Sequence, residues 1–515
     1  MIGPPSFTSI VIGILATAVA SLYIFLLRFK RQRESTKPFP QLSSPPLWHW
    51  VIGHVALLGE PCFETSLTTL SIKYANEHGQ TGFWMAFEPA IAVTNVLDAK
   101  AILHASHYRA PVSHMARHMA RFLGANNITQ LMGKEWKYHR AAILRAFSPS
   151  VVQQTQKEVV ETSQVLVASL RPLDGAVVDV EPLMKMVTMD VFGWTSLSRD
   201  LHCCATLKPS AIAKAFDFLG VEFNRRLQSP LGLASTFYWI PTKVNRMHNR
   251  QRALIRDFIQ DIVAERRDMS TNPPTDLLTY LLQAHSDLSN NATEAVSSET
   301  LTDILMSLLF AGYDSTSITL TYALYNLAKY PKAEEECLKE IQRVFASTSP
   351  KPEELVYCNA VILETLRLFP PATATSRTLT KDLTLEGGFV AEAGTFVFIP
   401  IWAIQRNAEY FPSPDEFLPE RWATKRGEGL WEERSEGGVQ AGVIAPANRN
   451  AFLAFSAGAR SCAGSRFALM EATLVLASLV KDISFSIDPY MVVKPRRSGF
   501  MQRPDGGMPM KVTFR

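Results

Sequence analysis

Between about residues 149 and 370, apolar positions recur at the three- and four-residue spacing of helices with one buried face. The clearest helical pattern runs over residues 300–330 and ends before Pro331. Thr300 and Asp303 have the spacing of a capping box, so we expect the helix to start at Thr300. At about 1.5 Å per residue this helix would be roughly 45 Å long and would cross a whole globular domain.

Patterns typical of β-strands are few, and the clearest are residues 82–93 and 394–401. The polar, glycine-rich residues 423–450 are expected to form a loop. We find no tandem repeat and no linker that would divide the body of the chain. The sequence therefore predicts a mainly α fold with small β-sheets, in one domain that covers residues 51–515.

The N-terminal region has a different pattern. Residues 7–27 carry no charge and, as a helix, would span roughly 30 Å, the thickness of the hydrocarbon core of a bilayer. Basic residues follow directly, and the positive-inside rule then leaves the rest of the chain in the cytosol. A cleaved signal peptide and a buried core helix are the alternatives. We expect residues 1–28 to be a single transmembrane anchor and residues 29–50 to be a basic, proline-rich linker.

The composition is that of a globular protein. The 515 residues are 47% hydrophobic and 19% charged, and the net charge is +4. Such a chain has enough apolar surface to fold, and its charge is too small and too diffuse for a nucleic-acid partner. Six cysteines are too few for a disulfide framework, which favours a reducing compartment.

The most informative segment is residues 455–464, which contain Cys462 just before a helical pattern over residues 466–481. The amides and positive dipole of a helix N-terminus lower the pKa of a thiol and favour the thiolate, a soft ligand for iron. Gly458 permits a tight turn, Arg460 offers a fork for a carboxylate, and Phe455 would shield the site from water. A buried, inert cysteine in a glycine-bearing turn is the alternative.

This segment resembles the haem-ligand loop of the cytochrome P450 family, F-x-x-G-x-R-x-C-x-G, and has all five of its fixed positions. The resemblance implies the cytochrome P450 fold, with Cys462 as the axial thiolate and metal ligand of haem b.

Three further motifs occur in the order of that family. Residues 364–367 and 417–422 resemble its E-x-x-R and F-x-P-E-R-W segments, and would form a buried network of Glu364, Arg367 and Arg421. Residues 136–140 look like its W-x-x-x-R helix. The resemblance implies that the haem propionates are held by Trp136, Arg140, Arg377 and Arg460.

Residues 311–316, Ala-Gly-Tyr-Asp-Ser-Thr, look like the family's A/G-G-x-D/E-T-T/S motif. There Gly312 would let the helix pass close over the haem, while Asp314 and a hydroxyl would supply protons for oxygen activation. Ser315 replaces the usual threonine and Thr316 follows it, about 100° further around the helix, where we expect it to substitute poorly for Ser315. The alternative for such a pair is hydrogen bonding to carbonyls one turn earlier.

The resemblance implies a monooxygenase that inserts one oxygen atom of O₂ into an apolar small molecule, such as a terpenoid, polyketide, alkaloid or fatty acid. The chain has no motif for NADPH or flavin. Electrons would therefore come from NADPH–cytochrome P450 reductase, with cytochrome b5 as a further donor. Lys134 and Lys137 could dock such a partner or could form an ordinary solvated face.

The anchor and the family together imply the endoplasmic reticulum membrane, with the catalytic domain facing the cytosol. In that compartment the glycosylation sequons at Asn127 and Asn291 would stay unused. The insert at residues 423–450 is similar to those of fungal biosynthetic members and favours secondary metabolism. Two other functions remain open: an isomerase or dehydratase of the same fold that works without reductase, and a non-catalytic haem-binding electron carrier or sensor.

Overall fold

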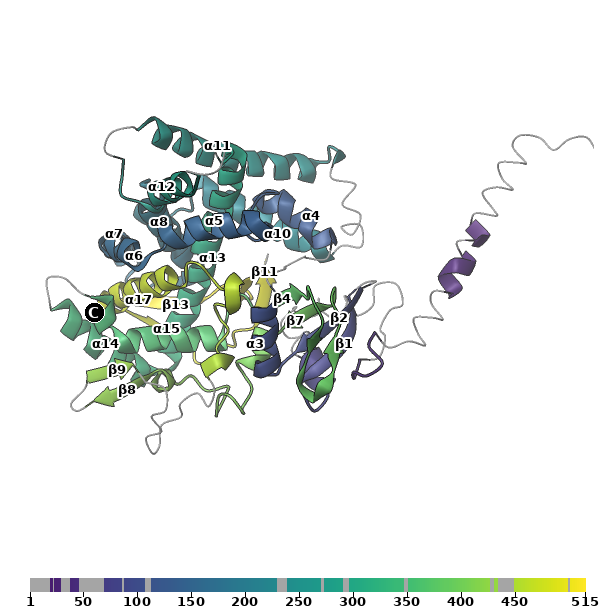
Figure 1. Ribbon diagram of the computed structural model, residues 1–515. Helices are drawn as coiled ribbons and strands as arrows, with labels where there is room; N and C mark the ends of the chain where they lie inside the picture. The colour runs from purple at the N-terminus through teal and green to yellow at the C-terminus, as the bar shows by residue number, and fades with distance from the viewer. Residues whose placement is uncertain are drawn as a thin grey trace, which may run out of the picture.

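The computed structural model describes residues 19–21, 23–28, 38–45, 69–85, 88–106, 113–228, 239–269, 273–289, 296–346, 351–426, 430–433, 449–498 and 501–515. These residues form a mostly helical body with a smaller β-rich part beside it, as the sequence predicts (Figure 1). The longer helices are α3 (Val96–Ala105), α4 (Ser113–Leu123), α5 (Gly133–Ala146), α7 (Gln156–Leu170), α8 (Val180–Leu197), α10 (Ala211–Gln228), α11 (Lys243–Asp268), α12 (Leu277–Ser289), α13 (Ser298–Lys329), α14 (Pro331–Phe345), α15 (Val356–Leu368) and α17 (Ser465–Asp482). Three short helices are α6 (Pro149–Gln154), α9 (Cys203–Thr206) and α16 (Ile401–Ile404).

The central element is α13, a helix of 32 residues that packs against α8, α15 and α17. Its predicted start was wrong by two residues, because Ser297 is the N-cap and its hydroxyl accepts from the Thr300 amide. Asp303 takes no part in a capping box. Its carboxylate pairs with Arg256 and accepts from the Asn126 amide, so it joins α13 to two other segments.

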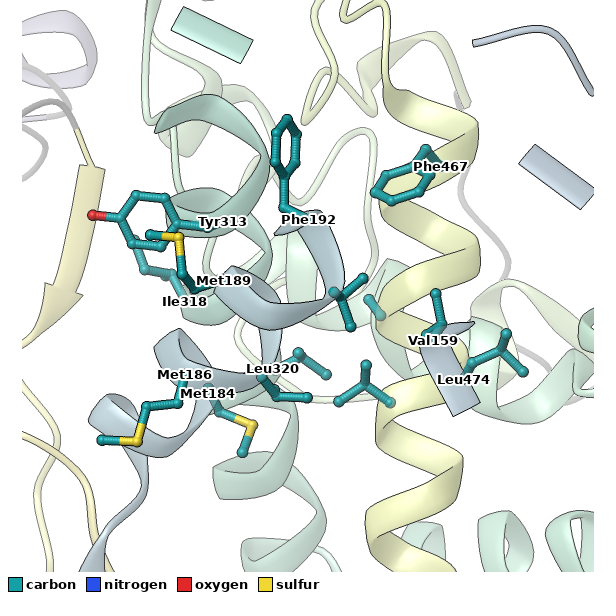
Figure 2. Close-up of a cluster of buried hydrophobic side chains, with 14 of the residues drawn as sticks. Val159, Met184, Met186, Met189, Phe192, Tyr313, Ile318, Leu320, Phe467 and Leu474 are labelled. Atoms are coloured by element: carbon teal, nitrogen blue, oxygen red, sulfur yellow. The ribbon is translucent and has the colours of Figure 1, made fainter. Parts of the chain in front are cut away.

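The largest core lies where α7, α8, α13 and α17 meet (Figure 2). Figure 2 shows Met184 and Met189 of α8 beside Ile318 and Leu320 of α13, and Leu474 of α17 beside Val159 of α7. All six side chains are fully buried. Burial of apolar surface contributes about 25 cal/mol per Å², so this core stabilises the packing of α13 against α8 and α17.

The main sheet has four strands in the order β1-β2-β7-β4. The predicted strand at residues 82–93 is two antiparallel strands, β1 (Gln80–Met85) and β2 (Glu88–Val93). The strand predicted at residues 394–401 is β7 (Phe396–Ile399), which lies parallel to β2 and antiparallel to β4 (Thr375–Thr378). This sheet forms the β-rich side of the molecule next to α3 (Figure 1).

The smaller sheets have two or three strands each. The remaining strands are β3 (Val177–Asp179), β5 (Leu383–Thr384), β6 (Val390–Ala391), β8 (Ala423–Arg426), β9 (Leu430–Glu433), β10 (Ile483–Ser486), β11 (Pro495–Ser498), β12 (Met501–Pro504) and β13 (Pro509–Phe514). The loop prediction for residues 423–450 was wrong at its start, because β8 and β9 pair as an antiparallel hairpin. The following residues, 434–448, lie outside the described part of the chain.

The predicted membrane anchor falls mostly outside the described residues, which include only 19–21 and 23–27 of its apolar stretch, as helix. Within the described ranges, no helix combines the length and the hydropathy that crossing a membrane requires. Of the predicted linker, the structure describes residues 38–45.

Candidate active site

The loop that carries Cys462 is held by its own backbone. The Cys462 amide donates to the Phe455 carbonyl at 2.9 Å, and the Ser461 amide donates to the Gly458 carbonyl at 3.0 Å. Gly458 has a φ of +70°, and a Cβ there would lie 2.2 Å from the Leu103 carbonyl oxygen. Both facts require glycine, as predicted. At Gly464 a Cβ would meet only Phe147, at 3.8 Å, so the protein itself does not require glycine there.

Cys462 faces an internal cavity of about 340 Å³. Ser315, Thr316 and Gly312 line this cavity from α13, and Ala468 and Ala472 line it from α17. Most of the remaining wall is aliphatic or aromatic, which is typical of a site for an apolar ligand. The structure thus brings the predicted ligand loop and the predicted proton-supplying helix to one cavity.

The environment of the Cys462 thiol differs from the prediction. Its accessible surface faces the cavity, but the surrounding protein buries the group, and this burial raises the pKa of Cys462. The Gly464 amide and the Arg140 guanidinium lower the pKa, as expected at a helix N-terminus, yet they do not outweigh burial. The prediction of a net lowered pKa was therefore wrong for the protein alone. Coordination to a metal deprotonates a thiol outright.

Trp136, Arg140 and Arg460 line the same cavity. The Arg460 guanidinium lies over the Trp136 ring at 4.1 Å, and its Nη2 donates to the Leu131 carbonyl at 2.6 Å. Arg140 Nη2 donates to the Ser461 carbonyl at 2.6 Å, so this arginine also braces the cysteine loop. Burial lowers the pKa of Arg140, and the nearby Cys462 opposes that shift.

Two arginines and an indole N–H on one wall suit an anionic group, and Arg140 Nε makes no hydrogen bond with any described residue. A thiol that faces a largely apolar cavity suits an iron-bearing, mostly apolar group. The residues present therefore fit a haem with its propionates.

Arg377 is placed differently. It is fully buried in β4, where its Nη1 donates to the Ser376 carbonyl at 2.8 Å and to Thr375 Oγ1 at 3.2 Å. Thr375 lines the cavity, but Arg377 is not among the lining residues.

Asp314 also lies away from the cavity. Its carboxylate is 1% exposed and pairs with Arg503 of β12, which in turn donates to Glu181 of α8 at 2.7 Å. Burial raises the pKa of Asp314, and the Arg503 guanidinium opposes this shift. The structure thus brings Ser315 and Thr316 to the cavity wall without Asp314.

The Ser315 hydroxyl makes the hydrogen bond that the alternative interpretation of the motif predicts. Its Oγ donates to the Ala311 carbonyl, one turn earlier, at 2.7 Å. The missing side chain at Gly312 leaves room for Phe192 as well as for the cavity. A Cβ at this position would lie 2.6 Å from Cδ2 of Phe192 on α8. The Ser315 bond is local to α13, whereas the approach of Phe192 to Gly312 depends on the tertiary structure.

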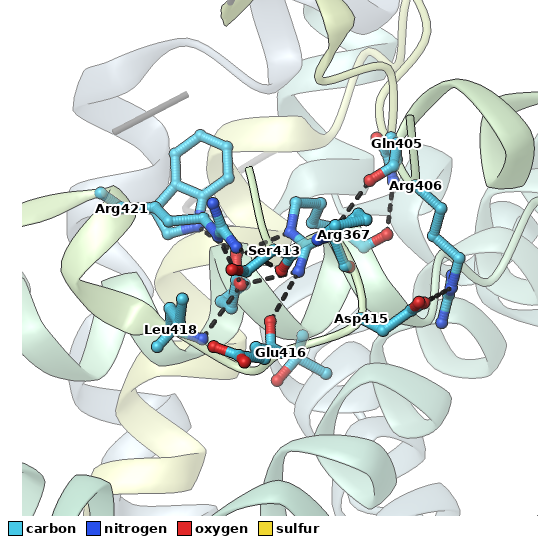
Figure 3. Close-up of polar contacts among 12 residues, drawn as sticks. Arg367, Gln405, Arg406, Ser413, Asp415, Glu416, Leu418 and Arg421 are labelled. Atoms are coloured by element: carbon cyan, nitrogen blue, oxygen red, sulfur yellow. Dashed lines mark hydrogen bonds and ion pairs between the residues drawn. The ribbon is translucent and has the colours of Figure 1, made fainter. Parts of the chain in front are cut away.

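The predicted network of Glu364, Arg367 and Arg421 is present and fully buried (Figure 3). Glu364 accepts from Arg367 Nη2 at 2.8 Å, from Arg421 Nε at 3.0 Å and from Trp422 Nε1 at 2.9 Å. The Glu364 carboxylate thereby joins α15 to the segment that follows residue 413.

Sequence reasoning attached no role to Gln405 and did not single out Arg503. Gln405 Nε2 donates to the carbonyls of Leu366 and Arg367, and its Oε1 accepts from the Leu453 amide. The side chain thereby links the Glu364 network to the segment before the cysteine loop. No local pattern marks these residues, since their partners are distant in sequence.

A cysteine that faces an internal cavity under a long helix, with two arginines on the cavity wall, defines a haem-thiolate site. The sequence profile described as "Cytochrome P450" matches residues 43–509. Human cytochrome P450 4F12 is 26% identical over 97% of this chain and 93% of its own length. Cyclooctat-9-en-7-ol 5-monooxygenase of Streptomyces melanosporofaciens is 28% identical over 70% of this chain and 72% of its own length.

The chain belongs to the cytochrome P450 family. It is therefore a monooxygenase with a haem b cofactor whose axial ligand is a cysteine thiolate.

Proposed function

We propose that this protein hydroxylates or epoxidises an apolar small molecule in the cavity beneath α13, with Cys462 as the haem ligand. The observation that carries the proposal is that Cys462, Trp136, Arg140 and Arg460 line one cavity with Ser315 and Thr316. Haem b, when bound, supplies the activation of O₂ and the insertion of one oxygen atom.

The residues of this chain have the remaining roles. Arg140 and Arg460, with Trp136, hold the propionates, and Arg377 supports this end from β4 through Thr375. Phe455 limits the access of water to the sulfur, because it lines the cavity beside Cys462. Ser315 and Thr316 border the reaction space, and Asp314, paired with Arg503, lies behind them.

The lining of the cavity supports an apolar substrate. Most of its lining residues are aliphatic or aromatic, and α13 contributes hydroxyls at Ser307, Ser315, Thr316 and Thr319. The Streptomyces relative is named for the oxidation of an alcohol, cyclooctat-9-en-7-ol. A terpenoid, polyketide, alkaloid or fatty acid used in secondary metabolism would suit such a wall.

The electron donor we propose is NADPH–cytochrome P450 reductase, with cytochrome b5 as a further donor. Lys134 and Lys137 are exposed on α5, the helix that also carries Trp136 and Arg140. Their position supports docking of an acidic partner near the haem edge. Residues 1–28 would anchor the protein in the endoplasmic reticulum membrane, with the catalytic domain in the cytosol.

The central test is the spectrum of the reduced, CO-bound protein. We expect the thiolate-specific Soret band of this family, and we expect Cys462→Ala to abolish it. Cys204→Ala is the matched control, because Cys204 is buried away from the cavity and should leave the band unchanged. Retention of the band in Cys462→Ala would refute the ligand assignment.

Turnover then separates the possible reactions. With added reductase, an apolar substrate should accelerate NADPH consumption and yield an oxygenated product. Product formation without reductase would instead identify the isomerase or dehydratase.

The membrane proposal has its own test. Deletion of residues 1–27 should reduce membrane association and leave haem binding intact, because the cavity is built from later residues. Equal membrane binding by the full and the shortened chain would contradict it.

Glycosylation of Asn127 cannot report orientation, since its side chain is fully buried and donates to the Gly124 carbonyl at 2.6 Å. Asn291 lies outside the described residues.

A further inference from the structure

The turn between α4 and α5 is organised by one amide side chain, that of Asn127. Asn127 is fully buried, and its Nδ2 donates to the Gly124 carbonyl at 2.6 Å and to Gln130 Oε1 at 3.3 Å. Its Oδ1 accepts from the Thr129 amide at 3.1 Å and from the Thr129 hydroxyl. An asparagine side chain has two donor hydrogens and an oxygen that can accept twice, so this turn uses its whole hydrogen-bonding capacity.

The backbone of the same turn is also closed on Asn127. The amides of Gln130 and Leu131 both donate to the Asn127 carbonyl, at 3.0 and 3.1 Å. The Asn126 amide donates to the Asp303 carboxylate at 3.0 Å, which ties the turn to α13. The conformation of the turn therefore depends on Asn127 from within and on a cavity-lining helix from outside.

This turn supplies the carbonyls that hold Arg460 of the cysteine loop. Arg460 Nη1 donates to the Ile128 carbonyl at 3.2 Å, and Nη2 donates to the Leu131 carbonyl at 2.6 Å. Both carbonyls lie within four residues of Asn127, so the turn that Asn127 builds sets their spacing. The Arg460 guanidinium also lies over the Trp136 ring at 4.1 Å. It is thus fixed between the turn and α5, at the wall of the cavity.

The position of this guanidinium has an electrostatic consequence for a haem in the cavity. A cation held close to the iron disfavours the ferric state, which carries the larger positive charge, relative to the ferrous state. A planar fork that is already oriented also binds a carboxylate with less loss of side-chain freedom. Residues 124–132 contain no charged side chain, so the turn can change the charge near the haem only through Arg460.

We propose that Asn127 is a positioning residue for the haem, because it shapes the turn whose carbonyls orient Arg460 toward a propionate. The inference deepens the proposed function and rests on its assignment of Arg460 to a propionate. It also gives a role to a motif that would stay unused as a glycosylation sequon. The asparagine and the threonine of that motif bond to each other inside the fold.

The test uses the full-length haem protein and measures two quantities that need neither substrate nor reductase. The first is the midpoint potential of the ferric–ferrous couple, and the second is the rate at which ferric haem passes to excess apomyoglobin. We expect Asn127→Ala to shift the potential to more negative values and to speed haem transfer severalfold, because Arg460 is no longer held in place. Failure of the proposed function shows separately, as absence of the thiolate Soret band in the unmodified protein.

A double-mutant cycle decides whether Asn127 acts through Arg460. Arg460→Gln should also shift the potential to more negative values, and in that background Asn127→Ala should cause no further shift, because the cation that it positions is gone. A shift of equal size in both backgrounds would overturn the proposal, and so would an unchanged potential in Asn127→Ala alone. If Arg460→Gln does not retain haem, Arg460→Lys takes its place in the cycle, since lysine lacks the fork that spans two carbonyls.

Asn326→Ala is the matched control for a general loosening of the fold. Asn326 is 2% exposed and its Nδ2 donates to Thr365 Oγ1 at 3.2 Å, but it is not among the residues that line the cavity. We expect this variant to keep the wild-type potential. A negative shift as large as that of Asn127→Ala would show loss of packing instead of orientation and would overturn the proposal.

A milder variant keeps the test decisive if Asn127→Ala does not retain haem. Asn127→Ser keeps a hydroxyl that can accept from the Thr129 amide but loses the donation that Asn127 makes to Gly124. We expect a smaller negative shift of the potential, again absent in the Arg460→Gln background. A shift that persists in that background would overturn the role of Asn127.

Discussion

At the scale of single residues, Gly312 shows how a motif position can have a structural reason that the motif does not reveal. The family resemblance explains this glycine by close passage of α13 over the haem. The structure adds that the ring of Phe192 occupies the space that a Cβ would need, 2.6 Å from Cδ2 and 2.8 Å from Cε2. Phe192 is 3% exposed and lines the cavity, and an alanine at position 312 would have to displace its ring.

We therefore expect Gly312→Ala to destabilise the fold by about 1–3 kcal/mol through overpacking, despite the better helix propensity of alanine. The measurement is denaturant unfolding of the haem-loaded protein. Gly220→Ala is the control, because Gly220 is also helical and a Cβ there would have nothing within 4 Å. The control should be neutral or more stable by up to about 1 kcal/mol. A Gly312→Ala protein as stable as that control would show that Phe192 moves without cost.

At the scale of elements, the Glu364 network fastens α15 to the segment at residues 413–422. Arg367 reaches beyond Glu364 to the carbonyls of Pro414 and Glu416, at 2.6 and 2.9 Å. Arg421 Nη2 donates to the Ser413 carbonyl at 2.8 Å (Figure 3). One carboxylate thus balances two buried guanidinium groups that also order a long irregular segment.

Replacing Glu364 by Gln should cost about 3–5 kcal/mol, because it leaves two buried guanidinium groups without a counter-charge. Thermal or chemical unfolding measures this loss, and reduced haem retention should accompany it. Glu416→Gln is the matched control. The Glu416 side chain is exposed and its contact with Arg367 uses the backbone carbonyl, so we expect a change within about 0.5 kcal/mol. Equal effects in the two variants would argue against a role for the charge.

Elements were predictable where the signal is local. The spacing of apolar residues gave α13 and α17 nearly to their ends, and the resemblance of residues 364–367 and 417–422 to family motifs gave the Glu364 network. The start of α13 was missed because Ser297 and Thr300 are both good capping residues, and only the backbone shows that Ser297 caps the helix. The β8–β9 hairpin was missed because polar, glycine-rich sequence is typical of loops as well as of exposed hairpins.

At the scale of the whole molecule, buried neutral histidines link stability to pH. Burial, and then the neighbouring His285, lowers the pKa of His139 on α5 to about 4. Burial, and then Arg226, lowers the pKa of His248 on α11 to about 4. His139 Nδ1 and His285 Nε2 lie 2.9 Å apart, so this pair also joins α5 to α12.

Because the unfolded chain binds protons at these histidines below about pH 6.5 and the folded chain does not, stability should fall as pH drops from 6.5 to 4. His248→Gln should make the fall shallower, and chemical denaturation across this pH range measures it. The control is His202→Gln, which removes a histidine whose side chain is 69% exposed. An unchanged slope in His248→Gln would show that this histidine is not kept neutral by the fold.

The sequence by itself determined the class of this protein, because a short contiguous loop around Cys462 and three ordered motifs carry the chemistry of a haem thiolate. It also determined the central helix, the buried Glu364 network and the choice of Trp136, Arg140 and Arg460 as cavity residues. Only the tertiary structure decided which way the side chains of α13 point. Asp314 turns to Arg503 of β12, which lies 189 residues later. The physical reason is that a motif specifies residue types at fixed spacing, whereas the orientation and charge state of a buried polar group depend on distant partners that the fold brings to it.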